Sequence, residues 1–173
     1  MDNVAVAEHL EYVVSVKEVI WGIALIAITM TMHAFGMVIT LQMSQRLRNR
    51  MPQRSGFLGG VRLLVFASWM IVLTHLLEVT VWAGFFTWRG ALPSISTANY
   101  YALLQYTTVG SDVSLPFDWR LLGGMLPMAG MLTFAWSTTV LLGLALHVQE
   151  VELRRRTHRP AADKSGNVAS DGG

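Results

Sequence analysis

The chain has 173 residues, of which 53% are hydrophobic and 14% are charged, and its formal net charge is +2. The charges gather at the ends of long apolar runs, which argues against nucleic-acid binding and favours a membrane protein. The absence of cysteine excludes disulfides, thiolate metal sites and cysteine nucleophiles. No phosphate-binding loop, dinucleotide fingerprint or nucleophile elbow occurs, and no enzymatic activity is predicted.

The first predicted element is an external N-terminal segment, residues 1–17, which is acidic. An apolar run follows, and a bilayer takes about 20 such residues to cross. Residues 18–45 are therefore predicted to form a transmembrane helix. A basic cytoplasmic loop is predicted at residues 46–61. This loop and the residue after it carry five arginines: Arg46, Arg48, Arg50, Arg54 and Arg62.

Residues 62–150 form the next predicted unit, which contains two further spans at about residues 63–88 and 121–148. The segment between these spans, Gly90–Trp119, is rich in prolines, serines and threonines. Its middle, residues 98–106, is compatible with a helix but is too short to cross a bilayer.

Arginines predict how the chain is oriented. They gather in the loop at 46–61 and again in the tail at 151–173, whereas the N-terminal segment is acidic. Cytoplasmic segments of membrane proteins carry the excess of Lys and Arg. We therefore predict a multi-pass protein of the cell inner (plasma) membrane with its N-terminus outside and its C-terminus cytoplasmic. The end of the tail, from about residue 160, is small and polar and is predicted to be disordered.

One motif in the external segment carries functional information. Thr107-Thr108-Val109-Gly110 resembles the start of the selectivity filter of potassium channels, where four TVGYG loops surround an ion with backbone carbonyls. Tyr100-Tyr101 stand where potassium channels have aromatic residues that support the pore helix. Gly130 stands where their inner helix has its hinge. The similarity covers about residues 62–148 and extends to bacterial three-span ion-channel proteins.

The motif departs from the family pattern after its glycine. Ser111 and Asp112 follow Gly110, where the family has Tyr-Gly. Two alignments are open. With a one-residue deletion, Asp112 matches the aspartate that follows the filter; without a gap, Ser111 replaces the tyrosine and Asp112 the second glycine. Either alignment removes the usual outer filter, which implies weakened potassium selectivity.

The resemblance implies an all-α membrane protein in which three transmembrane helices carry a re-entrant pore helix and filter loop between the second and the third. It implies a homotetramer in membrane lipid, with no cofactor and no metal beyond a permeating K+ or other monovalent cation. The pore helix would end near Thr107, and Gly110 would adopt a positive φ that turns carbonyls inward. One face of the last span would line the inner cavity: Met131, Phe134, Thr138 and Leu142.

Three ionisable residues fall inside the predicted spans, namely His33, His75 and Glu78. Such residues usually face the interior of the helix bundle. Glu78 is interpreted as a buried hydrogen-bond partner behind the pore helix, with packing between helices as the plainer alternative. His75 and Glu78 alone offer too few ligands for a metal site. Two histidines at similar depth could ligate a haem.

The predicted function is a passive cation channel; the alternative is a haem-binding or scaffolding membrane protein with a non-conducting outer loop.

Overall fold

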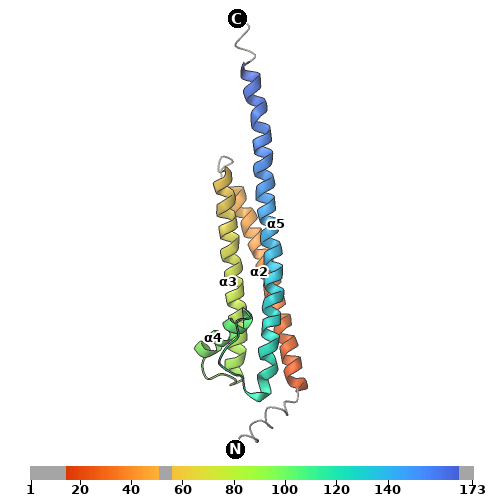
Figure 1. Ribbon diagram of the computed structural model, residues 1–173, viewed down its shortest axis with the longest axis vertical. Coiled ribbons are helices and arrows are strands. Elements are labelled where there is room, and N and C mark those ends of the chain that lie inside the picture. The colour runs from red at the N-terminus through yellow and green to blue at the C-terminus, as the bar shows by residue number, and fades with distance from the viewer. Residues whose placement is uncertain (1–14, 51–55, 168–173) are drawn as a thin grey trace, which may run out of the picture.

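The computed structural model describes residues 15–50 and 56–167, and this part of the chain is all-helical (Figure 1). The long helices are α2 (Val16–Arg50), α3 (Gly56–Trp88) and α5 (Arg120–Asn167). A shorter helix, α4 (Ile95–Tyr106), and a 3-10 turn, η2 (Phe117–Trp119), lie between α3 and α5 in the sequence. The three long helices pack side by side, and α4 lies against one end of this bundle (Figure 1).

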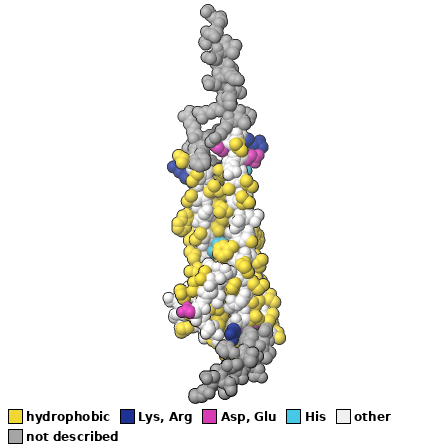
Figure 2. Space-filling model, in the orientation of Figure 1, with side chains coloured by type: hydrophobic (Ala, Val, Ile, Leu, Met, Phe, Trp, Pro, Cys, Tyr) yellow, Lys and Arg dark blue, Asp and Glu magenta, His cyan; other side chains and the backbone are white. Residues whose placement is uncertain are grey.

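Three segments are long and apolar enough to cross a membrane: Val16–Arg50, Leu58–Trp88 and Phe117–Arg154. The three predicted spans are thereby confirmed, and the chain has the architecture of a multi-pass membrane protein. On the face shown in Figure 2, hydrophobic side chains are spread over the middle of the bundle and charged side chains lie toward its two ends. This distribution matches an apolar belt bounded by two aqueous layers.

The helices extend further than the sequence predicted. Since α2 ends at Arg50 and α3 begins at Gly56, helix replaces most of the loop predicted at 46–61. The C-terminal helix runs to Asn167, so most of the predicted tail is helical and the disorder predicted from residue 160 is corrected as far as residue 167. Part of the reason is local: Arg154 pairs with Glu150 at 2.7 Å, one helical turn away. The predictions for residues 1–14 and 168–173 lie outside the described residues.

Aromatic side chains mark the end of the bundle at which α4 lies. The Arg89 guanidinium stacks over Trp21, Trp88 and Trp119, at 5.7, 5.3 and 5.1 Å from their ring centres. Lys17 lies 4.8 Å from the centre of the Trp119 ring. Tryptophans with basic partners are typical of a membrane–water boundary. This cluster therefore indicates the level at which the helices leave the bilayer.

A buried carboxylate ties two helices together at the same end. Glu18, in the first turn of α2, is 1% exposed. Its Oε1 accepts a hydrogen bond of 3.0 Å from the backbone N–H of Leu121, and its Oε2 accepts one of 3.2 Å from Ser15. A carboxylate is stabilising at a helix N-terminus, where backbone N–H groups lack helical partners. Glu18 therefore caps α2 and α5 together.

The short helix α4 begins at a defined cap and turns back along α3. The Ser94 side chain accepts a hydrogen bond of 3.1 Å from the backbone N–H of Thr97, as expected of an N-cap residue. Tyr101 packs edge-on against Phe86 of α3, and its hydroxyl lies 2.6 Å from where a β-carbon on Gly123 of α5 would stand. These contacts hold α4 against both α3 and α5.

Candidate functional site

The Thr107–Gly110 segment begins where α4 ends, and it closes that helix. Thr107 is the C-cap residue. The backbone N–H of Thr108 donates to the carbonyl of Gln105 at 3.0 Å, and those of Val109 and Gly110 donate to the carbonyl of Leu104 at 3.0 and 3.2 Å. This pattern is a Schellman motif, in which N–H groups beyond a helix satisfy its last carbonyls. The end predicted for the pore helix, near Thr107, agrees with the structure.

Two residues of this segment have positive φ. Gly110 has φ +84°, as predicted, and Thr108 has φ +62°. Glycine is the usual residue at the Schellman position that Thr108 occupies, and positive φ is rare for a β-branched side chain. Strained backbone of this kind costs about 1–3 kcal/mol and is typical of functional sites. The strained backbone at Thr108 therefore marks the Thr107–Gly110 segment as a candidate functional site.

The backbone carbonyls that directly follow Thr107 have no hydrogen-bond partner among the described residues. Within the described ranges, no hydrogen bond is accepted by the backbone oxygens of Thr108, Val109 or Gly110. Val109 is 73% exposed in the single chain. The segment therefore offers several carbonyl oxygens for which the described part of the chain provides no hydrogen-bond partner.

Tyr106, the last residue of α4, fixes the height of this segment. Its hydroxyl donates a short hydrogen bond to Oε2 of Glu78 on α3 and lies 2.5 Å from Oγ1 of Thr133 on α5. Glu78 lies about 15 Å along α3 from the helix end at Trp88, at 1.5 Å per residue. The end of α4 is thus held well inside the length of the bundle.

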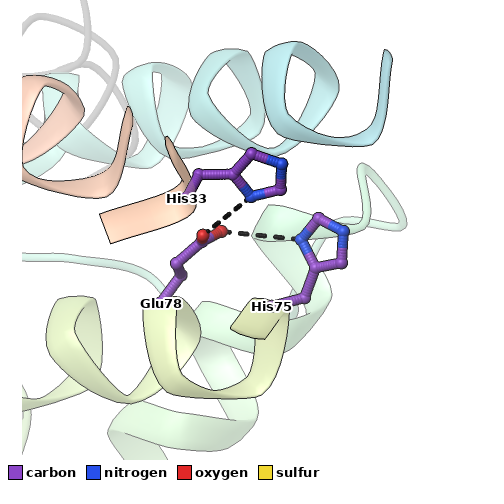
Figure 3. Close-up of side chains that lie close together, drawn as sticks. All are labelled: His33, His75 and Glu78. Carbon is purple, nitrogen blue, oxygen red and sulfur yellow. Dashed lines mark hydrogen bonds and ion pairs between the residues drawn. The ribbon is translucent and has the colours of Figure 1, made fainter. Parts of the chain in front are cut away.

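Behind Tyr106 lies a buried polar network that joins all four helices. Nδ1 of His33, on α2, lies 2.9 Å from Oε1 of Glu78, and Nδ1 of His75 lies 3.5 Å from Oε2 (Figure 3). The Ser137 hydroxyl, on α5, lies 3.2 Å from Nε2 of His33 and 3.0 Å from Nε2 of His75. Nδ1 of His75 also lies 2.8 Å from the Tyr106 hydroxyl.

The electrostatics of this network centre on one carboxyl group. Glu78 is 0% exposed, and no lysine or arginine in the described ranges forms an ion pair with it. A buried carboxylate is costly in a membrane unless hydrogen bonds and opposite charge compensate it. Here the compensating groups are two imidazoles and a phenol. The predicted interpretation of Glu78 as a hydrogen-bond partner of α4 agrees with this geometry.

Sequence reasoning missed three members of this network. Tyr106 directly precedes the Thr107–Gly110 motif, and Thr133 and Ser137 are one turn apart on the last span. The polar i, i+4 pair in a largely apolar helix was the available signal. No pattern in the sequence shows which polar groups on different helices meet, because that depends on the relative height and rotation of the helices.

Other predicted site residues are spread over the surface of the single chain. Tyr100 is 55% exposed while its neighbour Tyr101 is buried, so the two tyrosines do not act as a pair within one chain. Ser111 accepts a hydrogen bond of 3.1 Å from the N–H of Val113, and Asp112 is exposed. The predicted cavity face is also exposed, although the Phe134 ring contacts His75 at 4.6 Å between centroids; its residues are Met131, Phe134, Thr138 and Leu142.

Comparisons of this chain with protein families, with characterised proteins and with solved structures find no match.

Proposed function

We propose that this protein is a passive cation channel whose pore is built by four copies of the chain. The observation that carries the proposal is the position of the Thr107–Gly110 segment. It follows a short helix whose last residue, Tyr106, hydrogen-bonds Glu78 inside the bundle, and the carbonyls of Thr108, Val109 and Gly110 have no hydrogen-bond partner in the described part of the chain. Non-helical backbone at membrane depth is tolerated where it is buried in protein or lines a water-filled cavity. Under this proposal, α4 is a re-entrant pore helix.

The chemistry of the segment suits cations. Carbonyl oxygens of Thr108, Val109 and Gly110 would replace the water around an ion. The C-terminal end of α4 faces the same region, and a helix C-terminus carries roughly half a negative charge. Ser111 and Asp112 stand where a potassium filter has Tyr-Gly, so the expected permeant ion is potassium or another monovalent cation, with weakened selectivity.

In the proposed tetramer, the exposed face of α5 would line the inner cavity of the pore. Met131 is 55% and Leu142 57% exposed in the single chain, and both lie on the face that would line the inner cavity. One chain provides one filter strand, so a ring of four is needed to surround an ion. The proposed location is the inner (plasma) membrane, with the basic ends of the helices in the cytoplasm.

The alternative of a haem-binding or scaffolding membrane protein has less support. In a bis-histidine site, each imidazole faces the iron from opposite sides of a flat macrocycle. In this protein the two Nδ1 atoms face one carboxylate, and the two Nε2 atoms share the Ser137 hydroxyl. A scaffold role would not explain the strained backbone at Thr108. We therefore favour the channel.

Purified protein reconstituted in liposomes tests the proposal. Cation-dependent flux down a gradient, together with a mass of four chains per particle in native mass spectrometry, is the expected result. A monomer without flux would overturn it, and haem absorbance in the visible range would favour the alternative.

A further inference from the structure

The interior of the bundle contains three side chains with metal-ligating atoms close together, two histidines and a glutamate. Ligand atoms of His33, His75 and Glu78 all lie within 4.8 Å of one another. The residues come from α2 and α3, and their burial removes water as a competing ligand. We propose that this set binds one divalent transition-metal ion of the zinc and cobalt type. The inference does not depend on ion conduction.

The separations of the ligand atoms fit a tetrahedral ion. Metal–ligand distances near 2.0–2.1 Å place the ligands of a tetrahedral site roughly 3.3 Å apart. Nδ1 of His33 is 2.9 Å from one Glu78 oxygen, and Nδ1 of His75 is 3.5 Å from the other. All three ligand atoms lie within 4.8 Å of one another, so the side chains would have to draw together to surround the ion at this spacing. The Tyr106 hydroxyl, 2.8 Å from Nδ1 of His75, offers an oxygen as a fourth ligand atom beside these three.

The orientation of the imidazoles is that of metal ligands. Both rings turn Nδ1 toward the same carboxylate (Figure 3). Both rings also place Nε2 within hydrogen-bond distance of Ser137 Oγ. Metal-bound histidines usually donate their second N–H to a fixed acceptor, which holds the ring and its tautomer. A hydroxyl oxygen can accept two such bonds, so Ser137 is suited to orient both rings.

The charge of the site also favours a cation. Glu78 is fully buried, and no lysine or arginine in the described part of the chain pairs with it. Two nitrogens and a carboxylate oxygen suit zinc and cobalt, whereas calcium and magnesium prefer sites built from oxygen. The expected ligand is therefore a transition-metal ion and not a permeating alkali cation.

Cobalt binding to the full chain in detergent tests the proposal. The protein has five histidines, so the test uses a background with His9, His147 and His158 replaced by glutamine and an affinity tag without histidine. We expect one Co²⁺ per chain by dialysis and elemental analysis, with the visible absorption of tetrahedral cobalt. Because the site is buried, incubation continues until the absorbance is constant. Zn²⁺ should displace the cobalt signal.

Two variants assign the binding to this site. Glu78→Gln removes a charged ligand and should weaken binding at least ~10-fold, and Ser137→Ala should weaken it roughly 10–100-fold by freeing the imidazoles. If Glu78→Gln does not fold, as judged by its helical circular dichroism, cobalt binding by Ser137→Ala tests the assignment to this site. The proposal is overturned if the background protein shows no saturable binding of one ion per chain, if bound cobalt retains the spectrum of the aqueous ion, or if the folded variants bind cobalt as tightly as the background.

Discussion

The carbonyl oxygen of Tyr106 lies 2.1 Å from the position that a β-carbon on Gly130 would occupy. The end of α4 therefore rests directly on the backbone of α5, and the only side chain that this contact admits at position 130 is hydrogen. The sequence predicted Gly130 as a hinge by resemblance to channel inner helices. Close packing gives a sufficient reason for glycine here, and the two roles can be separated by experiment.

Gly130→Ala is expected to destabilise the protein by about 1–3 kcal/mol, because a methyl group cannot fit against the Tyr106 carbonyl without moving backbone. The matched control is Gly124→Ala, in the same helix, where a β-carbon would meet nothing within 4 Å. Alanine there should be neutral or stabilising, since it favours helix over glycine. Thermal unfolding in detergent measures both. Unchanged stability in Gly130→Ala with altered gating would favour the hinge.

Glu78→Gln should be milder than Glu78→Leu. The amide can still accept the Tyr106 hydroxyl bond and contact His33, whereas leucine removes the Glu78 partner of both the Tyr106 hydroxyl and Nδ1 of His33. Each unpaired buried polar group costs about 1–3 kcal/mol. Thermal unfolding and reconstituted flux are the measurements. If the two variants lose stability and flux equally, the negative charge itself is essential and the hydrogen-bonding role is insufficient.

Hydropathy was enough to predict the three spans, because each is one continuous helix that is long and apolar enough to cross a membrane. The short helix before Thr107 and the positive φ of Gly110 also followed from local sequence. The partnership of His33 with Glu78 did not, because it depends on how α2 and α3 are aligned in height. The positive φ of Thr108 was not predictable either, because propensity places glycine at that position of a helix cap.

Thr108→Gly should make the protein more stable and should reduce its cation flux. Glycine adopts φ near +62° without the steric cost that threonine bears, so we expect a gain of about 1 kcal/mol in thermal unfolding. The same change frees the backbone whose carbonyls are proposed to coordinate ions, and it should reduce flux in liposomes. A more stable variant with full flux would show that the strain at Thr108 has no part in conduction.

Gly110→Ala is expected to abolish conduction while the protein still inserts and assembles. A β-carbon at φ +84° is disfavoured, so the Gly110 carbonyl should turn away. Gly90→Ala is the matched control: Gly90 also has positive φ, +67°, and open space around it, but it lies in the turn after α3. Both variants should lose similar stability. Conduction should disappear in Gly110→Ala alone, and full flux through that variant would refute the filter assignment.

The pore should discriminate potassium from sodium less sharply than a complete TVGYG filter, because Ser111 and Asp112 stand where Tyr-Gly is expected. Fewer stacked carbonyl sites give an ion fewer chances to be rejected, and the exposed Asp112 carboxylate attracts cations with little regard to size. Bi-ionic reversal potentials on the reconstituted protein measure the selectivity.

Asp112→Asn should lower inward conductance more at low salt than at high salt, since the Debye length falls from about 30 Å at 0.01 M to about 10 Å at 0.1 M. Asp118→Asn, which removes an exposed carboxylate from η2, is the control and should leave this salt dependence unchanged. Near-ideal potassium selectivity would show that the segment after Gly110 rebuilds the missing sites by other means.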